Sequence, residues 1–103
     1  MDIQRLWHSI QTGELRITDH ADEEMATDKL SLEEVLMSVL NGEIIEDYPS
    51  DQPLPSCLVL GQTSKNDPVH SVWAYNEETG RAVLVTVYRP DPDRWIEFRA
   101  RKT

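Results

Sequence analysis

The sequence lacks the features that mark disulfide-bonded, secreted or membrane-spanning proteins. Its 103 residues include a single cysteine, Cys57, which excludes an internal disulfide and a zinc site built on paired cysteines. No apolar run approaches the roughly 18 residues of a membrane-spanning helix. The N-terminal residues MDIQRLWHS lack the basic start and apolar core of a signal peptide. We therefore expect a cytoplasmic, single-domain protein over residues 1–103, with no membrane attachment and no cofactor.

Basic residues are scarce in the first half of the chain. Residues 1–50 contain twelve Asp and Glu but three Lys and Arg, whereas residues 51–103 contain seven of each, so the net charge of −9 arises in the N-terminal half. Residues 81–103 contain six basic and three acidic residues and are the only region that would attract a polyanion. The acidic half would repel nucleic acid or attract a basic partner.

Capping signals and apolar spacing predict three helices. The first covers about residues 3–12, where apolar residues recur at helical spacing. The second begins within ITDHADEEM (residues 17–25), where Thr or Asp caps the helix and acidic residues fill the first turn. The third has a capping box formed by Ser31 and Glu34, and we expect it to end at Gly42 in a left-handed conformation.

After residue 42 the apolar pattern changes from helical spacing to alternation. Alternating and β-branched residues predict strands at 44–48, 57–62, 70–75, 82–88 and, as a short edge, 95–98. The NEETG segment predicts a hairpin that pairs the third and fourth of these strands. Val83, Val85 and Val87 are the predicted core face of residues 82–88. Helices followed by strands indicate an α+β domain with a helical part at about 1–42, a sheet part at about 43–98 and a basic tail at 99–103.

Two segments, NGEIIEDYP (residues 41–49) and TVYRPDPDRW (residues 86–95), are the most specific carriers of a family resemblance. Together with DHADEEM and VHSVWAYNEE, they make the chain resemble the domain-of-unknown-function family 4258. The family is similar to small bacterial endoribonuclease toxins of the RelE/ParE-like fold. The resemblance implies two to three N-terminal helices on one face of a curled antiparallel sheet of about four strands. It also implies an antitoxin-like partner of the zinc-finger type. Many members carry a basic residue where this chain has Glu24, and a glutamate repels phosphate.

Cleavage of RNA by its own 2′-hydroxyl needs a base, an acid and cations around the phosphate, but no metal. His20 and His70 are the predicted acid–base residues. Tyr88 is predicted to position or protonate an oxygen. Arg89 and Arg99 are the predicted phosphate-binding residues, because a guanidinium matches phosphate oxygens. A metal-independent endoribonuclease is therefore the first hypothesis.

Other interpretations use the same residues. A non-catalytic module of this fold would bind a basic protein through its acidic helical face. A metal-dependent hydrolase would use His20, Glu24 and His70 as ligands. In structural roles, His20 would pack between helix and sheet, and Arg89 would form a surface salt bridge with a nearby aspartate.

Overall fold

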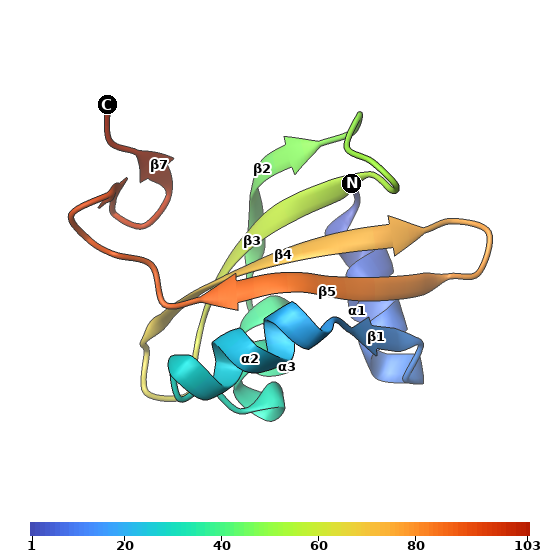
Figure 1. Cartoon of the computed structure of the whole chain (residues 1–103), viewed down its shortest axis with the longest axis horizontal. Coiled ribbons are helices and arrows are strands. Elements are labelled where there is room, and N and C mark those ends of the chain that lie inside the picture. The colour runs from blue at the N-terminus through green and yellow to red at the C-terminus, as the bar shows by residue number, and fades with distance from the viewer.

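The computed structural model describes all 103 residues and contains three helices and seven strands (Figure 1). The elements follow in the order α1 (Ile3–Thr12), β1 (Leu15–Ile17), α2 (Asp19–Thr27), α3 (Leu32–Leu40), β2 (Glu43–Tyr48), β3 (Ser56–Gln62), β4 (Pro68–Asn76), β5 (Arg81–Tyr88), β6 (Trp95–Ile96) and β7 (Ala100–Arg101). The predicted α+β class is confirmed. None of the helices is long and apolar enough to cross a membrane.

The main sheet has five strands in the order β1-β5-β4-β3-β2. Strands β2 to β5 pair antiparallel, as predicted, and the β4–β5 hairpin pairs Asn76 with Arg81. The expectation of a four-stranded, purely antiparallel sheet was wrong, because β1 pairs parallel with β5. Strand β1 lies between α1 and α2, so the helices do not form one uninterrupted N-terminal block.

The helix boundaries follow their capping residues. Thr18 caps α2, and Ser31 and Glu34 form the predicted capping box of α3. Gly42 does not adopt the left-handed conformation expected of it; the α3 cap is Asn41, at φ −102°. Gly42 is instead a point of close approach, where a Cβ atom would lie 2.5 Å from the carbonyl oxygen of Ser38. A side chain there would clash with α3.

The core lies between the helices and one face of the sheet. Leu6, Val35 and Val39 from the helices pack with Trp73 and Leu84 from the sheet, and all five are fully buried. The predicted valine face of β5 was wrong for two of its three members. Val85 is an extra residue between the Leu84–Trp73 and Thr86–Val72 pairs. This bulge reverses the alternation, so that Leu84 and Val87 face the core while Val85 is exposed.

Strands β6 and β7 form a small hairpin on the opposite side of the sheet from the helices (Figure 1). Strand β7 falls in the predicted basic tail, and the predicted edge strand at 95–98 is confined to Trp95 and Ile96. The chain turns between the strands through Glu97 and Phe98, at φ 51° and 62°. Positive φ is costly for residues with side chains, so other contacts must hold this turn.

Candidate functional site

Helix α2 covers the free edge of β5 beyond the point where β1 ends. The backbone N–H and side-chain hydroxyl of Thr18 donate to the carbonyls of Leu84 and Val85. Further along the helix, the carboxylates of Glu24 and Asp28 accept the backbone N–H groups of β5 and of the residue that follows it. These bonds satisfy an otherwise open strand edge and fix the position of α2 against the sheet.

His20 is the second residue of α2, as predicted, and its side chain is 66% exposed. Its Nε2 atom lies 3.1 Å from Oε1 of Glu24. The two atoms are at ion-pair distance, and the carboxylate favours a proton on Nε2, in which case Nδ1 carries the lone pair of the neutral ring. The pair therefore resembles the carboxylate–histidine unit that orients a general base.

Glu24 is fixed from the sheet side. Its Oε1 atom accepts a hydrogen bond from the hydroxyl of Thr86 and another, at 3.1 Å, from the backbone N–H of Val87. The glutamate thus links α2 to β5 and presents its carboxylate to His20 at the same time. These contacts with β5 and His20 explain why Glu24 is acidic, although many family members have a basic residue at this position.

His70 lies on β4 and is fully buried, on the sheet face opposite the helices. Its Nε2 atom lies 2.7 Å from the carbonyl oxygen of Phe98, and its Nδ1 atom lies 3.1 Å from the Tyr88 hydroxyl. Because a carbonyl only accepts, Nε2 donates and the Tyr88 hydroxyl donates to Nδ1. Burial lowers the pKa of His70, which favours this neutral ring. Both nitrogens are occupied, so His70 positions Tyr88 and the C-terminal hairpin.

Tyr88 lines the same pocket as His20. The pocket has a volume of about 260 Å³, and its walls are His20, Glu23, Glu24, Thr27, Asp28 and Tyr88. Burial raises the pKa of Tyr88, so the phenol stays protonated and remains a hydrogen donor at neutral pH. The structure therefore places an exposed histidine and a tyrosine that is held by a buried histidine on the walls of one pocket.

The two predicted phosphate-binding arginines differ in their surroundings. Arg89 donates to the carbonyls of Asp28 and Lys29 at 2.8 and 3.3 Å, and so caps the C-terminal end of α2. Its guanidinium also lies 3.7 Å from Asp67. Arg99 forms an ion pair with Glu43 and lines a separate pocket that contains neither predicted histidine nor Tyr88. Arg89 adjoins the His20 pocket through Tyr88, whereas no contact joins Arg99 to it.

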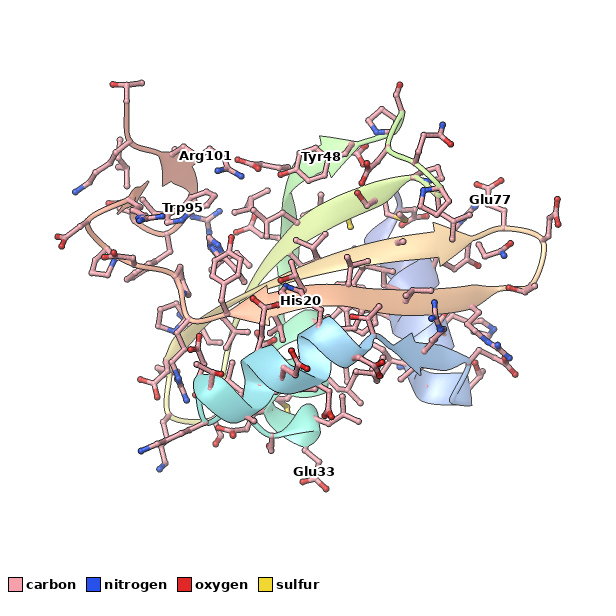
Figure 2. The ribbon with its side chains drawn as sticks, viewed as in Figure 1. His20, Glu33, Tyr48, Glu77, Trp95 and Arg101 are labelled. Atoms are coloured by element: carbon pink, nitrogen blue, oxygen red, sulfur yellow. The ribbon has the colours of Figure 1, made fainter.

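The residues that hold the hairpin were not found from the sequence. Trp95 stacks edge-on against His70 at 4.4 Å between ring centroids, and the guanidinium of Arg101 lies 4.8 Å from the Trp95 centroid. Arg101 also donates two 3.0 Å hydrogen bonds to Glu46 and thereby lowers the pKa of that carboxyl. Figure 2 shows Arg101 and Tyr48 pointing toward one another across the space between β7 and β2. The basic excess of residues 81–103 was the only sequence signal for these contacts.

The metal hypothesis lacks a ligand set. His20 and Glu24 lie together, but both nitrogens of His70 are engaged elsewhere. No group of three or more His, Cys, Asp or Glu side chains is arranged to hold a metal ion. Cys57 is buried as expected, and burial raises its pKa to about 12.

The comparison with protein families gives one match. A family model described as a domain of unknown function, DUF4258, matches residues 17–89. The chain belongs to this family. Searches of curated proteins and of solved structures found no significant match. The matched region contains His20, Glu24, His70, Tyr88 and Arg89, whereas the hairpin and Arg99 lie beyond its end.

Proposed function

We propose that the chain is the toxin-like component of a bacterial toxin–antitoxin pair and acts in the cytoplasm as a metal-independent endoribonuclease. The resemblance of the family to RelE/ParE-like toxins motivates the proposal. The observation that carries it is the pocket shared by Tyr88 and the His20–Glu24 pair. An oriented base and a protonated phenol on the walls of one pocket are the minimal acid–base set for attack by a ribose 2′-hydroxyl.

In this mechanism His20 is the general base. Its Nδ1 atom takes the proton of the 2′-hydroxyl while the 2′-oxygen forms a bond to phosphorus. Glu24 stabilises the positive charge that the ring gains, since its carboxylate lies 3.1 Å from Nε2. Thr86 and Val87 hold Glu24 through the bonds from β5, so the base keeps its orientation.

Tyr88 is the proton donor. As the bond between phosphorus and the 5′-oxygen breaks, the phenol turns its O–H away from Nδ1 of His70 and gives the proton to that oxygen, which leaves a 2′,3′-cyclic phosphate and a 5′-hydroxyl. The His20 imidazolium then returns a proton to the phenolate through water. His70 is a positioning residue, because its Nδ1 atom accepts the hydrogen bond that holds the Tyr88 hydroxyl before proton transfer, and its ring is buried. Arg89, the next residue, is the cation assigned to the developing negative charge on the phosphate, through its Nη1 atom, which makes no hydrogen bond to the end of α2.

Cleavage of RNA by purified protein in excess chelator tests the proposal. The wild type should cleave, and His20→Ala and Tyr88→Phe should each lower the rate by about 100-fold, the scale of general acid–base catalysis. His8→Ala is the matched control, because His8 is exposed on α1. Loss of wild-type cleavage in chelator, or equal rates in all four proteins, would contradict the assignment.

A second candidate function is a non-catalytic module that binds a basic protein through its helical face. Three apolar side chains of α3 are at least 40% exposed: Leu32, Met37 and Leu40. Glu33 projects from the same helix away from the sheet (Figure 2), and residues 17–46 contain nine acidic residues and one lysine. An exposed apolar stripe in acidic surroundings fits a basic amphipathic helix. We propose that an antitoxin-like partner of the zinc-finger type binds here.

A basic amphipathic peptide titrated onto the protein distinguishes the two functions. If the module hypothesis holds, the peptide binds, Met37→Lys abolishes binding, and RNA is not cleaved. Val85→Lys is the control, since Val85 is also an exposed apolar residue but faces the other side of the sheet. Unchanged binding by Met37→Lys would contradict the docking surface.

A further inference from the structure

Tyr88 also lines a second and larger pocket. It has a volume of about 680 Å³ and is formed where the end of β5 meets the C-terminal hairpin. Its lining residues are Tyr88, Arg89, Asp91, Asp93, Arg94, Trp95, Arg101, Lys102 and Thr103. We call it the basic groove. Four of the lining side chains are cationic and two are acidic, in a chain whose net charge is −9.

Two of the four cations are already engaged. Arg89 caps α2, and Arg101 is held by Glu46 and stacks on Trp95. The other two are available: the Arg94 side chain is 83% exposed with its nearest carboxylate, Asp91, at 4.0 Å, and Lys102 is exposed. Such a distant, exposed pair contributes little, so it does not neutralise Arg94.

The backbone brings the two available cations together. The N–H of Lys102 donates to the carbonyl of Arg94 at 2.9 Å, which joins the chain after β7 to the chain before β6. The hairpin itself is held on the sheet by the bond from His70 to the Phe98 carbonyl and by the burial of Trp95. Arg94 and Lys102 therefore project from a fixed base, which reduces the entropic cost of binding.

We propose that the basic groove binds the phosphate backbone of single-stranded RNA. The inference rests on the proposed function, because Tyr88 is a wall of both the groove and the His20 pocket. A strand whose phosphates lie along Arg94 and Lys102 passes Tyr88 on its way to His20. The groove volume of about 680 Å³ lies within the range of about 300–1,000 Å³ that is typical of ligand sites. The groove is therefore larger than a site for a single phosphate ion. Arg101 covers the Trp95 ring, so no base stacks there, and binding depends on the backbone rather than on sequence.

The test measures binding separately from cleavage. A fluorescent oligoribonucleotide that is 2′-O-methylated throughout lacks the attacking hydroxyl, so it reports binding alone. Its affinity for the full chain is measured by anisotropy over a range of salt concentrations. The variant is the double substitution Arg94→Gln and Lys102→Gln. The control is Arg16→Gln with Lys65→Gln, which removes the same charge from exposed positions outside the groove.

The groove variant should bind more weakly, and the slope of log K against log salt should fall in magnitude by about 1.4, or about 0.7 for each phosphate that is no longer neutralised. The control should match the wild type, and a scrambled sequence should bind as well as the original. If the groove and control variants weaken equally, or if the wild type does not bind the oligonucleotide, the inference is overturned. If the wild type binds but cleaves no natural RNA, the groove stands and the nuclease proposal fails.

Discussion

The Nε2 atom of His70 lies 2.7 Å from the carbonyl oxygen of Phe98, so a buried ring on β4 holds a turn that lies 28 residues away in sequence. The same ring accepts a hydrogen bond from Tyr88. One side chain thus connects the C-terminal hairpin with the tyrosine of the candidate site. His70 therefore contributes both to the wall of the basic groove and to the orientation of the phenol.

Replacement of His70 should release the hairpin. His70→Ala removes a buried ring and leaves the Phe98 carbonyl unpaired, and we expect the free energy of unfolding to fall by about 2–4 kcal/mol. Hydrogen exchange of the backbone amides of residues 95–102 should accelerate more than that of β3. His20→Ala serves as the control and should cost less than about 0.5 kcal/mol, because His20 is largely exposed. Unchanged protection of the hairpin would contradict the role of His70.

Stability should also depend on pH through His70. Burial lowers its pKa in the folded state, so below the unfolded value of about 6.5 the unfolded chain binds more protons. The stability contributed by the neutral ring is therefore complete above pH 6.5 and is lost as pH falls toward the folded pKa. Thermal unfolding between pH 7.5 and about 5 should show this loss in the wild type, and His70→Gln should show a smaller one. Parallel curves would show that His70 does not titrate in this range.

Glu24 both accepts a hydrogen bond from β5 and lies beside His20, so its substitution by alanine and by glutamine should have different effects. Glu24→Ala leaves the Val87 N–H without its acceptor and should destabilise the fold by about 1–3 kcal/mol. Glu24→Gln retains an acceptor oxygen for Val87 but removes the negative charge beside His20. We expect near-normal urea unfolding and a kcat for RNA cleavage that is lower by about tenfold. Equal loss of stability in both variants would leave Glu24 with a structural role alone.

Replacement by alanine should cost more stability at Gly61 than at Gly13. A Cβ atom on Gly61 would lie 1.7 Å from the carbonyl oxygen of Ser38, so Gly61→Ala forces α3 away from β3. We expect a loss of about 3 kcal/mol or more, at the upper end for overpacking. Gly13 has positive φ but nothing within 4 Å, so Gly13→Ala should cost about 1 kcal/mol. Urea unfolding of both variants tests whether the close α3–β3 contact determines the difference.

Local patterns predicted the elements that local chemistry determines. The capping box of Ser31 and Glu34 and the apolar patterns that predicted β2 to β5 lie within short stretches of chain, and the structure confirms the capping box and the four strands. Strand β1 was missed because three residues, Leu15–Ile17, are too short for a period and pair with a distant strand. The sequence gives no sign of the bulge at Val85, because valines occur at every second position from 83 to 87, as they would in a regular strand.

The candidate site was partly predictable for the same reason. His20 and Glu24 are one helical turn apart, so their contact follows from spacing alone. The contact between His70 and Tyr88 depends on the register of β4 and β5, which the sequence does not display. The hairpin depends on positive φ at Glu97 and Phe98, residue types that rarely adopt it. Arg94 and Lys102 were therefore counted as charges but were not placed in a groove.

The most direct test of the central claim uses a DNA oligonucleotide that contains a single ribonucleotide, incubated with the wild-type protein in excess chelator. Only that residue carries the 2′-hydroxyl from which the His20–Tyr88 mechanism forms a cyclic phosphate. We predict one cut, directly after the ribonucleotide, with a 2′,3′-cyclic phosphate on one product and a 5′-hydroxyl on the other, and no cut with His20→Ala. Absence of cleavage by the wild type, or cleavage at deoxynucleotides, would contradict the account.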